Sequence, residues 1–250
     1  MTTHPFEISG EIELAATPEQ VWEAITTGAG VDSWFLGRTT IEPRLGGRNT
    51  FQMQGQVEHS TVTAWEPGKR FAYRSDEAPD GAFMASESII EARDGGSTVL
   101  RMVQNGLLSG DDWESEYDAL RAGSPMYLRK LATYLAHFAG RTAQQHVFLI
   151  GPPVSDSDRV WATFTAAIGV TGSITEGDQV RFPMGDRTVE GDVAFVQEPI
   201  WFGVRTADGM HTFMHGFHSV IVLEYSGFTN DQDEEKIESA MRSWLETSFV

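Results

Sequence analysis

The sequence predicts an α+β protein made of two tandem copies of one module, each an antiparallel series of strands followed by a terminal helix. Two observations support this prediction. Residues 17–25 and residues 156–164 each carry a polar cap followed by a Val-Trp pair, and each segment lies near the start of one half of the chain. In both halves the expected elements come in the same order: a strand, the short helix that contains the Val-Trp pair, a series of strands and a terminal helix. We therefore expect a duplicated module whose copies have diverged.

Composition excludes several classes of function. The 250 residues include 18 basic and 36 acidic side chains, a formal net charge of −18. Nucleic acids and anionic membranes bind basic surfaces, so we expect neither as a partner. The chain has no cysteine, which excludes disulfides and thiolate metal ligands. No apolar run approaches the roughly 18 residues that span a bilayer, and no basic segment with an apolar run opens the sequence, so we expect a cytoplasmic protein.

The first half begins with a strand and a capped helix. Residues 6–14 alternate apolar and polar side chains, the pattern of a strand with one buried face. Thr17 is placed to cap a helix with Gln20 as its reciprocal partner. We expect this helix to end at Gly28 and Gly30. At least five strand-like runs follow, separated by glycine-rich turns, and predict an antiparallel meander.

Helical spacing returns over residues 113–138. We expect a break at Gly123, after which Ser124 caps and Pro125 opens a longer helix with one apolar stripe. A shortened version of the same order follows, and residues 140–145 form a polar boundary between the halves. The predicted domains are residues 1–140 and 146–250. Because the linker is short, we expect the two domains to touch, and from the duplication we expect them to pack together as a pseudo-dimer.

Four motifs in the first half together carry a family resemblance. They are W-F-L-G-R at 34–38, E-P-R-L-G-G-R at 42–48, W-E-P-G-K-R-F at 65–71 and N-G-L at 105–107. In this order they resemble the signatures of START-like (SRPBCC, helix-grip, Bet v 1-like) proteins, in the branch named after activators of the heat-shock protein ATPase. The resemblance covers about residues 6–138. The second half resembles a degenerate copy, since only its Val-Trp helix and its element order match.

The resemblance implies two tandem helix-grip domains, each a curved antiparallel sheet wrapped around its long C-terminal helix, with an apolar cavity between sheet and helix in the first. Strand parity and helical spacing then predict which side chains face that space. The alternative is that the same side chains fill the core and leave no cavity. The predicted lining consists of Trp34, Phe35, Phe51, Met53, Phe71, Tyr73, Leu100, Met102, Gln104, Tyr127, Leu131 and Tyr134.

Gln104 departs from the family pattern. Many relatives that resemble this chain carry a histidine at the position of Gln104, so the substitution removes a titratable group. This weakens any acid–base mechanism that the resemblance would imply. The amide can still orient a ligand, because it both donates and accepts hydrogen bonds.

Three histidines in the second half suggest a metal site. His211, His215 and His218 have the spacing H-x3-H-x2-H, and imidazoles are common metal ligands. On a strand, however, His211 and His215 share a face while His218 does not. No carboxylate partner is evident, so we expect partly exposed histidines on a strand pair, with no metal and no cofactor. A metal site at these three residues is the alternative.

Three functions follow from these observations, because a shared fold hosts many activities. The preferred one is a binding protein for a small hydrophobic or aromatic molecule, held in the first domain without a reaction. The first alternative is a cyclase or hydrolase that uses the same cavity. The second is a co-chaperone-like or regulatory module with a protein partner, suggested by the acidic surface and the family name. We expect the second domain to be a structural or regulatory companion.

Overall fold

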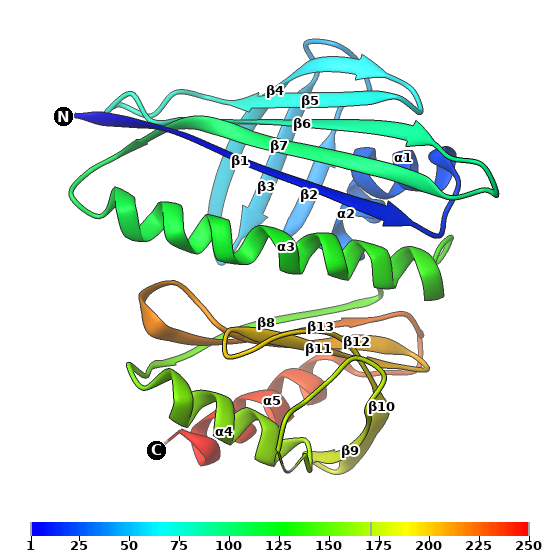
Figure 1. Cartoon of the computed structure of the whole chain (residues 1–250), viewed down its shortest axis with the longest axis vertical. Helices are drawn as coiled ribbons and strands as arrows, with labels where there is room; N and C mark the ends of the chain where they lie inside the picture. The colour runs from blue at the N-terminus through cyan, green and yellow to red at the C-terminus, as the bar shows by residue number, and fades with distance from the viewer. Residues whose placement is uncertain (1, 171, 250) are drawn as a thin grey trace. The chain divides into compact units, whose positions relative to one another are not determined.

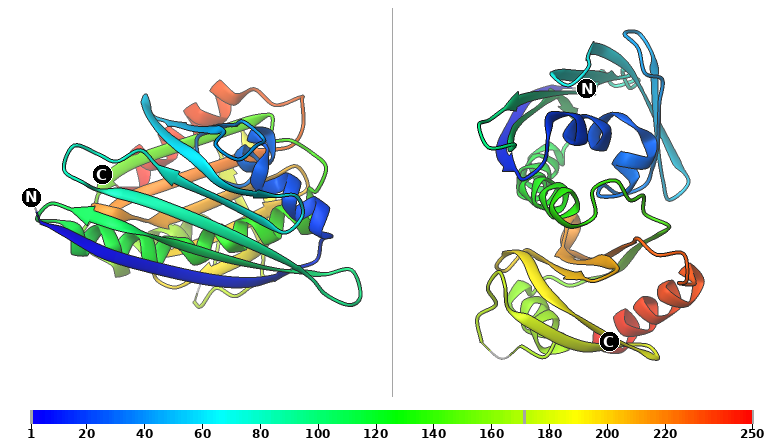
Figure 2. Two further views of the ribbon diagram at one scale, coloured as in Figure 1. Left: turned by 90° about the horizontal axis from the view of Figure 1, so that it is seen from above. Right: turned by 90° about the vertical axis from the view of Figure 1, so that its right-hand side faces the viewer.

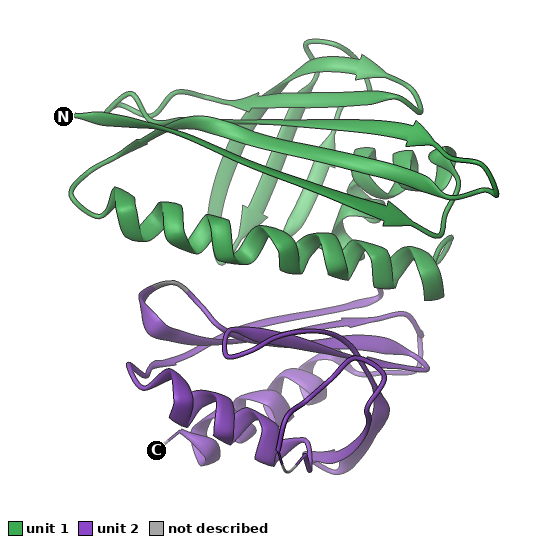
Figure 3. Ribbon diagram, in the orientation of Figure 1, with its two compact units in different colours: residues 1–142 green, residues 143–250 purple. Residues whose placement is uncertain are grey.

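The computed structural model describes residues 2–170 and 172–249. The chain divides into two compact units, residues 1–142 and 143–250, drawn in separate colours in Figure 3. Each unit contains one antiparallel sheet and a C-terminal helix, which confirms the predicted tandem helix-grip architecture. Among the helices of the described residues, none is both long enough and apolar enough to cross a bilayer.

The first unit is a seven-stranded sheet with the order β1-β7-β6-β5-β4-β3-β2. The helix α3 runs along the inner face of this sheet, and Figure 2 shows the strands curling around it. The helices α1 and α2 lie at one end, between β1 and β2 (Figure 1). The elements are β1 (Thr3–Leu14), α1 (Pro18–Thr26), α2 (Gly28–Asp32), β2 (Arg38–Ile41), β3 (Arg48–Met53), β4 (Gln56–Glu66), β5 (Arg70–Ser75), β6 (Phe83–Ala92), β7 (Thr98–Ser109) and α3 (Trp113–His137).

The start of α1 follows the sequence pattern. The Thr17 hydroxyl accepts a hydrogen bond from the backbone N–H of Gln20 at 3.4 Å, and the Gln20 side chain accepts one from the N–H of Thr17 at 2.9 Å. This reciprocal pair satisfies two donors that the first helical turn leaves free. The predicted capping box is therefore confirmed.

The predicted end of α1 is wrong in part. α1 stops at Thr26, but Gly28 and Gly30 lie inside the second short helix α2. The hydroxyl of Thr27 accepts a hydrogen bond from the N–H of Gly30 at 3.0 Å and so starts this helix. A Cβ at Gly30 would lie 2.3 Å from the carbonyl oxygen of Glu23. The glycine thus permits a close helix approach instead of ending the helix.

The predicted break before Pro125 is also wrong. α3 is continuous over its full length, with Gly123 and Pro125 inside it. Proline removes one helical hydrogen bond and crowds the preceding turn. Packing of the apolar stripe offsets this cost, because Leu128, Leu131 and Leu135 are all buried. Tertiary contacts therefore override the local breaker signals.

The second unit repeats the architecture with one strand fewer. Its six-stranded sheet has the order β8-β13-β12-β11-β10-β9, which matches the order of the first sheet without its last strand. The helices α4 and α5 lie on the same face of this sheet (Figure 1). The elements are β8 (Gln145–Pro153), α4 (Ser157–Ala167), β9 (Gln179–Met184), β10 (Arg187–Gln197), β11 (Trp201–Thr206), β12 (Gly209–His215), the 3₁₀ turn η1 (Phe217–Ser219), β13 (Val220–Gly227) and α5 (Glu234–Ser248).

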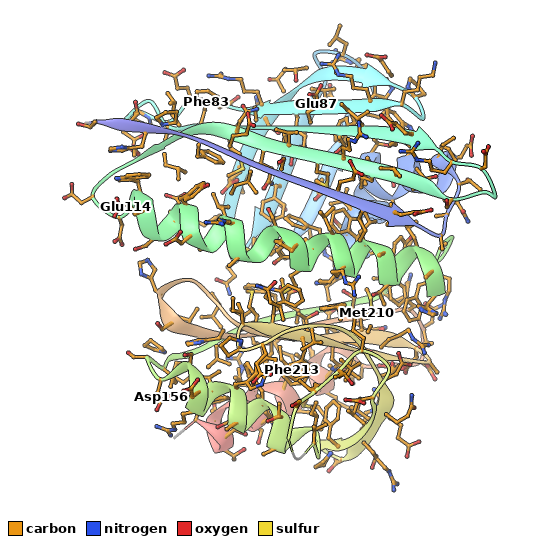
Figure 4. All side chains as sticks on the ribbon, in the orientation of Figure 1. Phe83, Glu87, Glu114, Asp156, Met210 and Phe213 are labelled. Atoms are coloured by element: carbon orange, nitrogen blue, oxygen red, sulfur yellow. The ribbon has the colours of Figure 1, made fainter. Side chains whose placement is uncertain are left out.

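Aromatic rings fill the space between this second sheet and its helices. Phe213 on β12 lies between sheet and helices (Figure 4) and stacks on Phe202 with ring centroids 4.7 Å apart. Phe164 on α4 contacts both rings, and Trp244 on α5 contacts Phe164 and Phe213. Phe164, Phe202 and Phe213 are at most 2% exposed. The inner face of the second sheet is therefore a closed core.

Candidate ligand-binding site

The inner face of the first sheet consists of rows of side chains that lie directly opposite one another on neighbouring strands. One row runs from Tyr73 on β5 through Ser86 on β6 and Gln104 on β7 to Ile8 on β1. The next row contains Phe71, Ser88 and Met102 in the same strand order. Strand pairing therefore brings together residues that are far apart in the sequence.

Five of the twelve predicted lining residues lie in the closed part of the core. They are at most 5% exposed: Trp34, Phe71, Leu100, Leu131 and Tyr134. Two of them also donate a side-chain hydrogen bond to a backbone carbonyl. The indole N–H of Trp34 donates to the carbonyl of Ala24 at 2.9 Å, and the Tyr134 hydroxyl donates to the carbonyl of Arg141 at 2.9 Å. These side chains hold the domain together.

The other seven predicted residues keep part of their surface accessible. They are Phe35, Phe51, Met53, Tyr73, Met102, Gln104 and Tyr127, all partly buried. Their aromatic members are in contact: the Phe35 ring lies 4.6 Å from that of Tyr127 and 5.9 Å from that of Phe51. The accessible residues thus come from β3, β5, β7, α3 and the segment before β2.

Packing changes along the length of this inner face. On β7, Leu100 is fully buried, whereas Met102 and Gln104, the next residues on the same face, stay partly accessible. On β5, Phe71 is 3% exposed, whereas Tyr73 is only partly buried. Side chains on central strands beneath a helix are normally excluded from water. The face is therefore closed at Leu100, less tightly filled at Met102 and Gln104, and closed again at Leu108, which is 5% exposed.

Polar side chains lie at the less tightly filled part of the face, around Gln104. The Ser124 hydroxyl on α3 donates to the side-chain oxygen of Gln104 at 3.1 Å. The amide nitrogen of Gln104 has no acceptor among the residues that the structure describes. Burial raises the pKa of the Tyr73 hydroxyl, and the nearby Ser86 hydroxyl partly opposes that shift. An amide, a phenol and two serine hydroxyls therefore face one apolar surface.

Sequence reasoning did not place Ser86, Ser88 or Ser124 in this lining. Ser86 and Ser88 alternate with Glu87, whose side chain is on the opposite face and pairs with Arg70 at 2.5 Å. That alternation was available in the sequence and marks both serines as inward-facing. Small serines on the third strand of the sheet leave volume for a larger neighbour or a ligand.

The inner face offers little acid–base chemistry. Over the described residues of β5, β6 and β7, this face carries no histidine and no carboxylate, and Tyr73 is its one titratable group. Glu116 on α3 is partly buried, and desolvation raises the pKa of its carboxyl group. Its position lies outside the row that contains Gln104. On β4, the exposed Glu58 lies directly opposite Phe51 and shares its face, and its charge also raises the pKa of the Tyr73 hydroxyl. The described residues of β5, β6 and β7 supply hydrogen bonds for orientation.

The three histidines of the second unit are held apart. His211 is 6% exposed, and burial lowers the pKa of its imidazole to about 4. The ring of His211 packs on Tyr225 at 4.6 Å. His215 contacts the carbonyl of Val154 at 2.8 Å, and His218 is exposed. Within the described residues, no three His, Cys, Asp or Glu side chains are arranged to hold a metal ion.

Comparison with known proteins assigns the first unit to a family. Residues 15–136 match the family model described as "Activator of Hsp90 ATPase homolog 1-like protein". This segment belongs to that family. The resemblance seen in the four sequence motifs is thus confirmed, and we call residues 15–136 the activator-homologue domain. No curated protein matches the chain.

Several solved structures are similar to this chain. Protein MLL2253 from Mesorhizobium loti is 24% identical, with a TM-score of 0.47, and the match covers 53% of this chain and 98% of that one. The Aha1 dimer from Colwellia psychrerythraea is 19% identical, with a TM-score of 0.44, and covers 52% of this chain and 96% of that one. The di-domain ARO/CYC protein BexL of the BE-7585A pathway is 11% identical, with a TM-score of 0.48, and covers 97% of this chain and 94% of that one.

Proposed function

We propose that the activator-homologue domain binds a small hydrophobic or aromatic molecule between its sheet and α3. The observation that carries this proposal is the change in packing along β7, from the buried Leu100 to the partly accessible Met102 and Gln104. Small-molecule sites are mostly apolar, with a few convergent polar groups. The partly accessible aromatic residues supply flat apolar contacts, and the methionines adapt to ligand shape.

Gln104 and Tyr73 orient the ligand in this proposal. The free amide nitrogen of Gln104 donates a hydrogen bond to a carbonyl or hydroxyl oxygen of the ligand. Ser124 fixes the amide, because its hydroxyl already donates to the other end of the same group. The Tyr73 hydroxyl lies in the same row of side chains and supplies a second contact. The ligand is therefore mainly apolar, with at least one oxygen.

Binding is proposed in preference to a reaction. A cyclase or hydrolase needs a titratable base or acid beside the reacting atoms. On β5, β6 and β7, as far as the structure describes them, Tyr73 is the sole inward-facing titratable group, and burial raises the pKa of its hydroxyl. The carboxylate of Glu58 shares this face from β4, opposite Phe51, but it is exposed to solvent. A phenol is protonated at neutral pH even at its ordinary pKa of about 10, and the raised pKa favours that form further, so the Tyr73 hydroxyl acts as a donor.

Native mass spectrometry of the gently purified full chain tests the proposal first. We expect a retained small molecule, or a rise in Tm with members of a broad neutral aromatic set such as 2-naphthol. Met102→Trp fills the accessible space and abolishes the rise. Arg101→Gln is the matched control, since Arg101 is on the outer face of the same strand and pairs with Glu11 at 2.5 Å. Bare protein with no ligand-induced shift from the set would refute the proposal.

A second candidate follows from the family description alone. The matched family is named for activation of the Hsp90 ATPase, so contact with such a chaperone is the alternative function of this domain. The test is the ATPase rate of an Hsp90-type chaperone with and without the full chain. A rate that rises in proportion to complex formation supports this function. An unchanged rate, with no chaperone retained by the immobilised chain, excludes it.

A further inference from the structure

A groove on the second unit is separate from the proposed ligand site of the first. It runs between α4, α5 and β9 and has a volume of about 610 Å³. Small-molecule sites commonly span roughly 300–1,000 Å³. The residues that line it are Arg159, Ala162, Thr163, Ala166, Ala167, Pro183, Trp244 and Ser248.

One wall of the groove is a single face of α4. Its residues follow the spacing i, i+3, i+4, i+7 and i+8 that brings side chains onto one helix face. The wall begins at Arg159 and continues with methyl groups, so its charge is concentrated at one end. From Arg159 to Ala167 this face is about 12 Å long at 1.5 Å per residue. The wall therefore combines a cationic end with an apolar stretch of alanine and threonine methyl groups.

The opposite wall carries free hydrogen-bond donors on a rigid support. Trp244 packs on Phe164 and Phe249, with ring centroids 6.2 and 5.8 Å apart, and is partly accessible. Its indole N–H has no acceptor among the described residues, and the Ser248 hydroxyl, one helical turn further, has no partner there either. The core thus fixes the ring of Trp244, and its indole N–H remains available to donate a hydrogen bond to a ligand.

Arg159 differs from every other lysine or arginine of this unit. Over residues 143–170 and 172–249 its guanidinium is the one such group without a carboxylate partner. The remaining lysine and arginine side chains each lie within 3.7 Å of a carboxylate: Arg181, Arg187, Arg205, Lys236 and Arg242. In a chain with a net charge of −18, an unpaired guanidinium at the end of an apolar groove is available for an external anion.

We infer that this groove binds a small aromatic carboxylate. The guanidinium of Arg159 forms two parallel hydrogen bonds with the carboxylate, the fork geometry that suits this pair. The flat ring lies between the alanine methyl groups of α4 and Trp244. A phosphate monoester of the same ring would also meet the guanidinium, but it carries more than one negative charge at neutral pH, so the single cation favours the singly charged carboxylate.

Titration of the full chain with naphthalene-2-carboxylate tests this inference, followed by NMR at the indole N–H of Trp244. The chain has seven tryptophans, so the Trp244→Phe variant identifies the signal. We expect a saturable shift of this signal, and an Arg159→Gln variant that binds about ten times more weakly, since a charge-assisted pair is lost. The neutral analogue naphthalene-2-methanol should bind wild type and Arg159→Gln equally weakly at this site.

Two control variants test whether the shift at Trp244 depends on the groove. Arg181→Gln removes another exposed arginine of the same unit, whose guanidinium pairs with Glu190 at 2.8 Å, and should leave the titration unchanged. Met102→Trp, which blocks the site proposed in the first unit, should also leave it unchanged. Absence of a shift at Trp244, an equal affinity of wild type and Arg159→Gln, or an equal affinity for acid and alcohol would each overturn the inference.

Discussion

Truncation of two residues on the same face of β7 measures how tightly the first unit is packed. Leu100→Ala and Met102→Ala remove the same number of heavy atoms, and the two positions are neighbours on one face of one strand. Leu100 is fully buried, so its loss combines the transfer of about three methyl-sized groups at ~0.8 kcal/mol each with the cost of a cavity. We expect a destabilisation of about 3 to 4 kcal/mol.

Met102→Ala should lower the free energy of unfolding much less than Leu100→Ala. Its side chain is partly accessible in the folded state, so truncation forfeits only part of the transfer energy and creates no new closed cavity. We expect about 1.5 kcal/mol, and thus a difference of about 2 kcal/mol between the two variants. Urea unfolding of the full chain measures both, from the shift of the same transition midpoint. Equal costs for the two variants would show that Met102 lies in a filled core, and would refute the packing argument for the ligand site.

Three further predictions concern pH dependence, helix capping and the volume beside Met102. His211→Phe should remove a pH dependence of the stability of the second unit. The pKa of His211 in the folded state is about 4, below the usual ~6.5, so the unfolded chain gains the proton first as pH falls. In the wild type the free energy of unfolding should therefore fall by about 2 kcal/mol between pH 7 and 5, measured by urea unfolding. Thr17→Ala should cost about 1 kcal/mol in the same assay through loss of the α1 cap, and Thr17→Ser should restore it. Ser88→Leu should weaken binding of 2-naphthol at least tenfold while Tm stays constant or rises; a large fall in Tm would mean that the volume beside Met102 is already occupied.

Elements with a local code were predictable from the sequence. The alternation in residues 6–14 gives β1, and the capping box of Thr17 and Gln20 gives the start of α1. The end of α1 was predicted in part: α1 ends at Thr26, just before Gly28, but Gly28 and Gly30 then belong to α2, which the Thr27 hydroxyl caps. The prediction at Gly123 failed, because the packing of Leu131 outweighs a local preference of about 1 kcal/mol.

The site was predictable only as a face. Strand parity places Leu100, Met102 and Gln104 on one side of β7, and the structure agrees. Parity does not say where along that face the packing closes, because closure depends on the size of side chains on other strands and on the helix. Tyr134 shows the same limit: helical spacing turns it inward, but its hydroxyl donates to the carbonyl of Arg141.

The two units show how side-chain size on one strand changes the packing of two sheets that have the same strand order. β6 and β12 each occupy the third position from the edge of their sheets. The inward residues of β6 include Ser86 and Ser88, whereas those of β12 are His211 and Phe213. A phenylalanine ring fills volume that a serine leaves free, so the second sheet closes on an aromatic core and the first stays partly accessible. Burial of those rings stabilises the second unit, whereas the serines of β6 contribute less apolar burial to the first.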